Sequence, residues 1–312
     1  MRVLITGGAG FIGSNLVAEW HRRGAEVTVF DNLVATCSLR SIERFLGDVR
    51  FVHGDVRAPE DFLRLPPGPY DRVYHLAASF ANELSMEQPT LDTRTNEEGT
   101  RNLVEHARRV GCGLLVYTGS SSSYGDVPVP MSEDGPLRPQ TPYAASKLAG
   151  EQLVRESSLP FAVLRLFNVY GPGDPPGRYR NAVPNMFRAL DAPDERLRIF
   201  GENATRDFTY VGDLMHVLVD ANRARDQVVN VASGLETRVV DLAQTILAIR
   251  RRPAGHVAIE PRRDWDRVIR RQADVTRLRQ LFGEVPATPI EEGLRRTFAW
   301  LAENGHLREE VA

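Results

Sequence analysis

The amino-acid sequence predicts an α/β protein built around a doubly wound parallel sheet. Short apolar runs of strand type alternate with segments of helical spacing over the first half of the chain, which is typical of parallel strands joined by helices. The first apolar run ends in the glycine-rich stretch GGAGFIG, and a helical segment follows at once. The second run ends in an acidic residue, Asp31, as in dinucleotide-binding sheets.

Apolar spacing and bounding residues justify the expected elements in chain order. The strand at 2–6 is apolar and stops before a Gly–Gly pair, and the helix at 14–24 closes at Gly24. The later strands are short apolar runs, and the later helices repeat apolar residues three and four positions apart. In order, these are the strands 26–31, 50–56 and 72–78, the helix 100–111, the strand 114–120, the helix 146–157 and the strand 161–168.

The pattern changes beyond about residue 170. Loops rich in Pro, Gly and Arg, at 170–181 and 260–267, separate shorter elements. We expect a smaller α/β region here that covers the carboxyl edge of the sheet, where ligands of such folds bind. The predicted division is a first domain of residues 1–166, to which 209–231 returns, and a second, substrate-binding region of residues 167–208 and 232–312.

Composition places few further constraints on function. Of the 312 residues, 42% are hydrophobic and 26% are charged, as in ordinary globular proteins. A net charge of −2 gives no general attraction to nucleic acid or to an anionic membrane, and no apolar run is long enough to span a bilayer. The two cysteines, Cys37 and Cys112, suggest neither a disulfide framework nor a metal site. We therefore expect a cytoplasmic protein without a metal, a nucleic-acid partner or a membrane anchor.

The glycine-rich loop predicts a dinucleotide site. Gly7 permits a tight turn, Gly10 lets the backbone approach a pyrophosphate, and Gly13 lets the helix pack closely on the strand. Asp31 lies where a residue would bind the adenosine ribose, and its charge would repel a 2′-phosphate, which favours NAD over NADP. Asp31 could instead only begin a turn. Asp55 lies where it could meet the adenine, or it could cap a helix or turn.

Lys147 is the only lysine among 39 lysines and arginines, so a specific requirement for its shape is indicated. Tyr143 precedes it by four residues, which on a helix puts both side chains on one face. A nearby ammonium and a positive nicotinamide both favour the phenolate of a tyrosine. Such a tyrosine can remove a hydroxyl proton while hydride leaves the same carbon. An arginine in place of Lys147 would carry the same charge on a bulkier, planar group. The alternative is a surface Tyr and Lys on an amphipathic helix.

Many stretches match one family in order along the chain. They are TGGAGFIG, DN at 31–32, GDV at 54–56, HLAA at 75–78, NEEGTRNL at 96–103, GSSSSYG, YAASK, RLFNVYGPG, RDFTYVGD and AD at 273–274. By these motifs the sequence resembles the extended short-chain dehydrogenases/reductases of the NAD-dependent nucleotide-sugar epimerase/dehydratase family, most closely the UDP-sugar 4-epimerases. The resemblance covers about residues 1–300. It implies a Rossmann domain that binds NAD and a C-terminal region that binds a nucleoside-diphosphate sugar, with uridine as the expected nucleoside.

The resemblance also implies how the cofactor is held and how subunits pair. A homodimer would form through a four-helix bundle, to which each subunit gives helices at about 91–109 and 144–157. The residues expected to bind NAD are Gly7, Gly10, Phe11, Ile12, Gly13, Asp31, Asn32, Asp55, Val56, Leu76, Ala77, Ala78, Asn96, Tyr143 and Lys147.

The serine run narrows the expected reaction. By the resemblance, Ser120 hydrogen-bonds the sugar C4 oxygen and shares its proton with Tyr143, so Ser120, Tyr143 and Lys147 form the expected catalytic set. Related 4,6-dehydratases carry an acidic pair at the positions of Ser121 and Ser122, and uronate decarboxylases keep a glutamate at the second. Serine substitutes poorly as a general acid or base, because its pKa lies far from neutrality. The sequence therefore favours 4-epimerisation, by C4 oxidation, rotation of the 4-keto sugar and re-reduction.

Two other interpretations stay open. One is a different enzyme of the same fold, either a 4-ketoreductase or a dehydratase that uses other acid and base groups. The other is a nucleotide-sensing regulator without activity. Such regulators typically lose the Tyr/Lys pair, so its retention argues for an enzyme.

Nucleotide-sugar anchoring is expected from the second region. By the resemblance, Asn168 contacts the diphosphate and Arg206 holds a phosphate, for which the guanidinium fork is well suited. A further arginine should come from residues 260–274, where Arg263 and Arg267 both qualify.

The sugar is not determined by the sequence. The loop at 79–89 lies where the family shapes the sugar pocket, and Phe80, Asn82 and Glu83 are unusual there. Glu83 would disfavour a uronate carboxylate unless it points away, whereas Arg178 and Arg180 could bind one. The substrate-binding set therefore includes Ser120, Ser121, Ser122, Tyr143, Asn168, Arg206, Arg263, Arg267, Glu83 and Arg180, with hexose, N-acetylhexosamine and hexuronate all open.

Overall fold

A computed structural model describes residues 1–34, 39–192, 195–283 and 287–308, so Cys37 lies outside the described residues. Within these residues the central sheet has seven strands. They are β1 (Arg2–Thr6), β2 (Glu26–Asp31), β3 (Arg50–His53), β4 (Arg72–His75), β5 (Leu115–Ser120), β6 (Phe161–Leu166) and β11 (Gln227–Val231).

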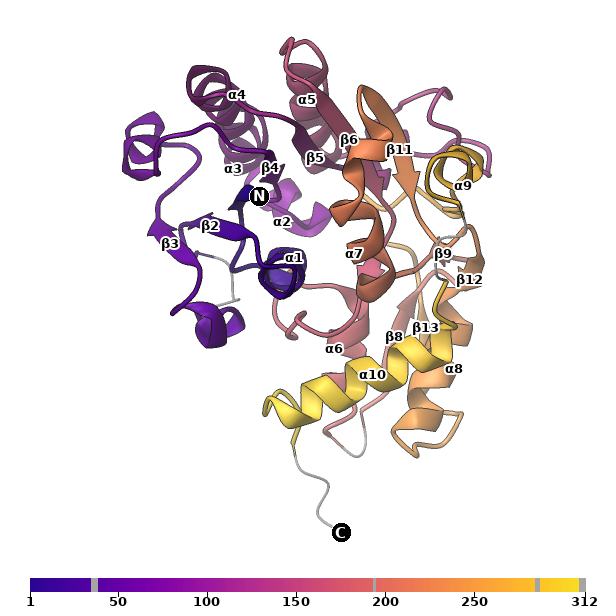
Figure 1. Cartoon of the computed structure of the whole chain (residues 1–312). Helices are drawn as coiled ribbons and strands as arrows, with labels where there is room; N and C mark the ends of the chain where they lie inside the picture. Colours follow the sequence, from indigo (N-terminus) through magenta and orange to yellow (C-terminus); the bar gives the residue numbers. More distant parts are fainter. Residues whose placement is uncertain (35–38, 193–194, 284–286, 309–312) are drawn as a thin grey trace.

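The sheet is wholly parallel, in the order β11-β6-β5-β4-β1-β2-β3 (Figure 1). The strand order reverses between β1 and β4, and in such sheets the ligand crevice opens at the carboxyl ends of the strands at that point. The predicted doubly wound Rossmann class is therefore confirmed. β11 pairs with β6, so a segment that follows the first region by some sixty residues returns to the edge of the same sheet.

Helices cover both faces of the sheet, because alternate strand residues point to opposite sides. On one face α1 (Phe11–Arg22) packs beside α7 (Val211–Val219), over a core that contains Val3 and Ile5 of β1. On the other face α4 (Gly99–Val110) packs beside α5 (Pro142–Arg155), over a second core that contains Leu4. Both cores exclude water almost completely.

The segment before α4 differs from the expected single helix at 91–109. It consists of α2 (Asn82–Glu87), α3 (Pro89–Asp92) and a π-helical turn, Thr93–Glu98, that leads into α4. Single π-turns of this kind are frequent at functional sites. Short 3₁₀ helices occur at Leu39–Ser41, Glu43–Phe45, Pro59–Arg64, Ser121–Tyr124 and Ala221–Ala224.

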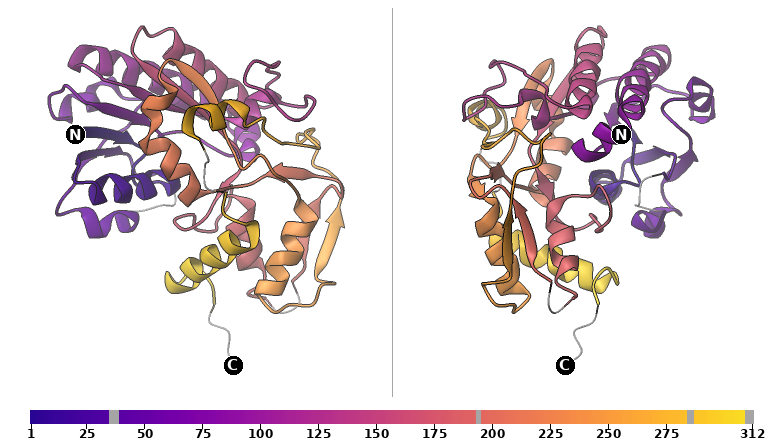
Figure 2. Two further views of the ribbon diagram at one scale, coloured as in Figure 1. Left: turned by 45° about the vertical axis from the view of Figure 1, so that its right-hand side comes forward. Right: turned by 180° about the vertical axis from the view of Figure 1, so that it is seen from behind.

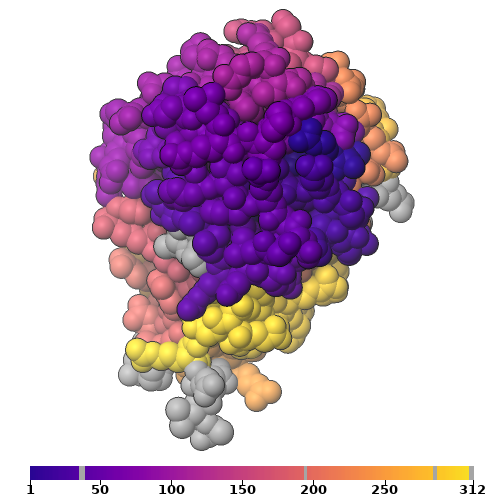
Figure 3. Space-filling model, turned by 60° about the vertical axis from the view of Figure 1, so that its left-hand side comes forward, coloured from indigo at the N-terminus to yellow at the C-terminus, as the bar shows by residue number. Residues whose placement is uncertain are grey.

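A smaller α/β region with its own core lies over the carboxyl edge of the sheet (Figure 2). The last helix of this region lies next to the N-terminal part of the chain at the surface of the molecule (Figure 3). The elements are β7 (Val169–Tyr170), α6 (Ala182–Ala189), β8 (Leu197–Phe200), β9 (Thr205–Asp207), β10 (Thr209–Tyr210), β12 (Glu236–Arg238), α8 (Val239–Ile249), β13 (Val257–Glu260), α9 (Thr276–Phe282) and α10 (Ile290–Glu303). The exact domain division stays a prediction.

Candidate active site

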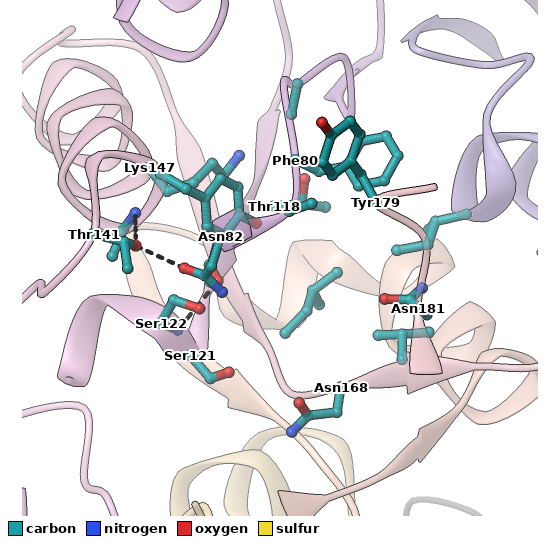
Figure 4. A pocket seen from close by; sticks show the side chains of 18 of the residues that line it. Phe80, Asn82, Thr118, Ser121, Ser122, Thr141, Lys147, Asn168, Tyr179 and Asn181 are labelled. Atoms are coloured by element: carbon teal, nitrogen blue, oxygen red, sulfur yellow. Dashed lines mark hydrogen bonds between the residues drawn. The ribbon is translucent and has the colours of Figure 1, made fainter. Parts of the chain in front are cut away.

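A cavity of about 540 Å³ lies between the carboxyl ends of the strands and the C-terminal region (Figure 4). All ten residues predicted to bind the nucleotide sugar line it, and so do the three predicted catalytic residues, Ser120, Tyr143 and Lys147. Most of the predicted cofactor residues line it as well. These are Gly7, Gly10, Phe11, Ile12, Gly13, Asp31, Asn32, Val56, Leu76, Ala77, Ala78, Tyr143 and Lys147.

Asp55 and Asn96, also predicted to bind the cofactor, lie behind the cavity wall. The Asp55 carboxylate accepts hydrogen bonds from Asn32 and Arg57, and although burial acts to raise its pKa, these bonds hold it at about 2. The Asn96 amide donates to the Ser79 carbonyl and accepts from the Ser79 N–H. In this structure both residues therefore shape the loops that line the cavity.

The glycine-rich loop forms a cradle that side chains would fill. Gly7 has a φ of +71°, and its carbonyl accepts a hydrogen bond from the Gly10 N–H at 3.0 Å. A Cβ atom on Gly13 would lie 2.1 Å from the Gly7 oxygen. α1 begins here with no side chain capping its first N–H groups, so these donors can meet a phosphate. The residues present therefore fit a dinucleotide pyrophosphate.

The cradle gives a first testable prediction. Replacing Gly13 by alanine should abolish NAD binding and destabilise the protein, because the new methyl group cannot fit against the Gly7 carbonyl. We expect the dissociation constant for NAD, measured by calorimetry, to rise by at least about 10²-fold. Gly47→Ala is the matched control, since a Cβ there meets nothing within 4 Å. Unchanged NAD affinity in Gly13→Ala would contradict the assignment.

Hydrogen bonds to the Asp31 carboxylate link the glycine-rich loop to the end of β2. One carboxylate oxygen accepts from the Ala9 N–H at 3.0 Å and the other from the Leu33 N–H at 2.8 Å. Burial raises the pKa of Asp31, while these two backbone bonds lower it. The carboxylate thus lies in the cavity wall with fixed orientation, where it can accept the hydroxyls of a ribose.

Tyr143 and Lys147 project from the first turns of α5, which Thr141 caps by accepting the Ala144 N–H at 3.2 Å. Burial raises the pKa of Tyr143, and the Ser120 hydroxyl lowers it. The Asp92 carboxylate raises this pKa further, whereas the Arg271 guanidinium lowers it. A hydroxyl group and a cation near Tyr143 therefore both favour its phenolate, the form that can act as a base.

Lys147 is buried beside the Tyr117 ring, with its Nζ 4.4 Å from the ring centroid. Burial lowers its pKa to about 7 from an ordinary value of 10.5, and the Glu151 carboxylate acts in the opposite direction. Lys147 lines the cavity, where its ammonium could donate hydrogen bonds to the ribose hydroxyls of a dinucleotide.

The depressed pKa predicts a stability effect of Lys147 that depends on pH. Below pH 7 the native and unfolded chains are both protonated, and the native state carries the full cost of the buried charge. Between pH 7 and 10.5 native Lys147 is neutral, and the cost falls as pH rises. Lys147→Met should therefore raise the thermal midpoint of the NAD-free protein, by roughly 5 °C near pH 6.5.

The rise should shrink toward pH 9.5, and parallel thermal scans at the two pH values measure it. Leu148→Met, on the same helix, is the control and should show no such pH dependence. An equal rise at both values would mean that the Lys147 charge is not the cause.

The serine run continues β5 into the 3₁₀ helix Ser121–Tyr124. The Ser120 Oγ accepts the Ser122 N–H at 3.1 Å, which fixes the turn. Ser120, Ser121 and Ser122 all line the cavity, and the last two are labelled in Figure 4. Below them the buried pair of Arg165 and Glu151, at 2.7 Å, supports the strand end.

The arginines of the C-terminal region line the opposite wall. Arg206 pairs with Asp266 at 3.1 Å and donates to the Thr205 carbonyl at 2.8 Å. Arg263 pairs with Glu83 across the cleft at 3.8 Å, so a positive charge faces the Glu83 carboxylate. Two guanidinium groups therefore lie where a diphosphate could bind, each beside a carboxylate.

Sequence reasoning missed Arg271, which lines the same cavity. It comes from the run that contains Arg263 and Arg267, but its side chain is buried and its electrostatic neighbours include Tyr143 and Arg206. Burial lowers its pKa to about 10, as does the Arg206 charge. The run of arginines was the available signal, but it could not tell which side chain points inward.

Fold and site together define a dinucleotide-dependent α/β enzyme of the short-chain dehydrogenase/reductase type. The sequence profile of the NAD dependent epimerase/dehydratase family matches residues 3–232. The chain belongs to this family, and its cofactor is NAD.

Relatives extend over nearly the whole chain. A UDP-glucose 4-epimerase of Mycolicibacterium smegmatis is 33% identical over 95% of this chain and 97% of its own length. A UDP-N-acetyl-alpha-D-glucosaminuronate decarboxylase of Bacillus cytotoxicus is 30% identical, covering 97% and 98%. The solved structure of the epimerase Mth375 from Methanothermobacter thermautotrophicus has a TM-score of 0.92 at 36% identity, covering 97% and 93%. These relatives differ in reaction, so similarity gives the family and not the activity.

Proposed function

We propose that the chain is a UDP-sugar 4-epimerase that works by transient oxidation at C4. One observation carries the proposal: Ser121 and Ser122 occupy the cavity wall beside Ser120 and Tyr143. Among the described lining residues the carboxylates are Asp31, at the cofactor loop, and Glu83 and Asp266, which pair with arginines. A dehydratase or decarboxylase would need a free acid or base at this wall.

The catalytic roles follow from the positions of the side chains. Bound NAD supplies the acceptor and donor of the C4 hydride. The Tyr143 phenolate takes the proton of the C4 hydroxyl and later returns it, and the Ser120 hydroxyl holds the C4 oxygen and lowers the pKa of Tyr143. Lys147 binds the nicotinamide ribose hydroxyls, and its charge favours the phenolate.

Epimerisation also needs a sugar that can turn while its nucleotide stays fixed. Asn168 and Arg206, with one or more of Arg263, Arg267 and Arg271, hold the diphosphate. The 4-keto sugar then rotates in the cavity, and hydride returns to its opposite face. Atoms and electrons balance, because the hydride and the proton that leave C4 and its oxygen both come back.

Product analysis by proton NMR tests the proposal. The purified protein, without added cofactor, is incubated separately with UDP-glucose, UDP-N-acetylglucosamine and UDP-glucuronate. We expect the matching galacto-configured sugar in at least one tube. A keto or unsaturated sugar, or release of carbon dioxide, would show a dehydratase or decarboxylase instead. No change in any tube would favour the regulator interpretation.

We also propose a cytoplasmic homodimer that forms through α4 and α5. Leu148 and Leu153 of α5 are only half-buried, and Arg101 and Glu105 of the neighbouring helix α4 are exposed. An apolar face bordered by positive and negative residues can pair with the same face of a second copy, because a two-fold axis places each charge opposite the other sign. Sedimentation analysis should find two subunits, and Leu148→Glu should return the protein to monomers.

A further inference from the structure

Arg165 of β6 is a charged side chain in the core of the protein, and it is only 1% exposed. Its Nε and Nη2 donate to the two carboxylate oxygens of Glu151, at 3.0 and 2.7 Å. Its Nη1 donates to the Tyr124 hydroxyl at 2.8 Å and to the Glu133 carbonyl at 3.2 Å. A buried guanidinium is costly unless such partners meet it, so these bonds fix the position of the side chain.

The partners of Arg165 belong to the two elements that carry the predicted catalytic residues. Glu151 lies on α5, about two turns after Tyr143. Tyr124 ends the 3₁₀ helix that begins directly after Ser120. β6 lies next to β5 in the sheet, and α5 packs on both strands (Figure 1). Arg165 therefore joins the helix of the Tyr/Lys pair to the turn of the serine run.

The Tyr124 hydroxyl is bonded on both sides. It accepts from Arg165 and donates to the Asn230 Oδ1 at 2.7 Å. The Asn230 amide donates in turn to the Met131 and Asp274 carbonyls, at 2.8 and 3.2 Å. Because the hydroxyl is used both as donor and as acceptor, the serine turn ends at a fixed point relative to α5.

This fixed point is needed because Ser120 and Tyr143 lie on different elements. Ser120 is the last residue of β5, and Tyr143 is in the first turn of α5. Burial raises the pKa of Tyr143, and a hydrogen bond with the Ser120 hydroxyl lowers it. Such a bond weakens steeply when its geometry is lost, so the two elements must keep their relative position. The Tyr117 hydroxyl, which donates to the Lys147 carbonyl at 3.0 Å, joins α5 to the middle of β5 and not to the turn.

We propose that Arg165 is a positioning residue of the reaction: by joining α5 to the serine turn, it keeps Ser120 within hydrogen-bonding distance of Tyr143. The inference rests on the proposed function for the roles of Ser120 and Tyr143. Arg165, Glu151 and Tyr124 lie behind the cavity wall and do not line it. Arg165 therefore acts through the residues that it positions.

Removing the Tyr124 hydroxyl breaks the link without changing a charge near Tyr143. Burial raises the pKa of Tyr124 to about 12, so its side chain is neutral near pH 7. The polar and charged groups that face Tyr143 are Ser120 and Tyr117 of β5, Asp92 of α3, Arg271 of the C-terminal region and Lys147 of α5 itself. Tyr124→Phe alters none of these groups, so a change in the titration of Tyr143 would report its distance from Ser120.

The Tyr143 phenolate gives a direct test, because its ultraviolet absorbance differs from that of the neutral ring. NAD-loaded wild type and Tyr124→Phe are titrated with base, each against the same protein with Tyr143→Phe, so that only Tyr143 is followed. We expect the midpoint of Tyr143 in Tyr124→Phe to lie at least about 0.5 pH unit higher, because the phenolate loses its hydroxyl donor. The turnover number should fall about tenfold with KM within about twofold, since the nucleotide anchors are unchanged.

Tyr74→Phe is the matched control, since Tyr74 is as deeply buried and its hydroxyl donates to the Leu218 carbonyl at 2.9 Å, away from the serine turn. This control should keep the wild-type midpoint and turnover number. Arg165→Lys is a second test that does not depend on the folding of Tyr124→Phe. It keeps the charge opposite Glu151 but lacks the planar fork of arginine, so the midpoint of Tyr143 should rise here too.

The outcomes separate this inference from the proposed reaction. An unchanged midpoint in either folded variant, Tyr124→Phe or Arg165→Lys, would overturn the inference, and so would a loss of turnover that Tyr74→Phe shares. The titration needs no substrate, so it remains a test if the proposed function fails. A raised midpoint in both variants, with a wild-type protein that epimerises none of the three UDP-sugars, would support the positioning of Ser120 by Arg165 and overturn only the 4-epimerase.

Discussion

Replacing Tyr143 by phenylalanine is expected to lower the turnover number by about 10³-fold while NAD stays bound. In the proposed reaction the substitution removes the one oxygen that carries the C4 hydroxyl proton, and it leaves the aromatic ring in place. Initial rates by NMR or by a coupled assay measure the turnover number, and calorimetry measures NAD affinity.

Tyr179→Phe is the matched control, because Tyr179 lines the same cavity but its hydroxyl donates to Glu87 at 2.5 Å, away from the serine run. We expect this control to keep turnover within about tenfold of the wild type. If Tyr143→Phe did the same, another group would have to be the base, and the role of the Tyr/Lys pair would be refuted.

Replacing Arg206 by methionine is expected to raise the KM for the nucleotide sugar by about 10²-fold, with a turnover number within a few-fold of the wild type. The diphosphate does not change charge during epimerisation, so its contacts stabilise the ground state and the transition state equally. Full saturation curves separate KM from the turnover number. A lower turnover number with unchanged KM would place Arg206 at the reacting carbon instead.

Arg206 also stabilises the segment around it, so the Arg206→Met variant must be checked for correct folding. Its guanidinium bonds Asp266 and the carbonyl of Ile269, both on the segment that leads to Arg271. Arg206→Lys keeps the charge and should recover part of the affinity. Arg198→Met, which removes a surface partner of Glu260, should leave KM unchanged.

Most of the fold could be read from local sequence patterns. Apolar runs bounded by glycine or aspartate predicted the parallel strands, because a strand buried on both faces must be apolar throughout. The glycine spacing predicted the cradle, because only a residue without a Cβ fits at Gly13. The four-residue step from Tyr143 to Lys147 needed only the geometry of one helix.

The structure of the segment before α4 could not be predicted from local sequence patterns. The helical spacing predicted a helix at 100–111, close to α4, and the family resemblance implied a longer one from about 91 to 109. In the structure Pro89 starts the short helix α3, and a π-turn, Thr93–Glu98, joins α3 to α4. The Asn96 side chain in this turn bonds to Ser79 and Ser146, which lie far from it along the chain. Contacts of this kind can override helical spacing, and no window of sequence contains them.

The sequence by itself determined the sheet, the cofactor loop and the Tyr/Lys pair, because each depends on residues within one strand, one turn or one helix. Only the tertiary structure decided that Asn82 meets Thr141, 59 residues away, that Glu83 is opposed by Arg263, and that Arg271 lies beside Tyr143. These side chains belong to segments that come together only when the C-terminal region closes over the sheet. Their orientation, and with it the charge offered to the sugar, is a property of that packing.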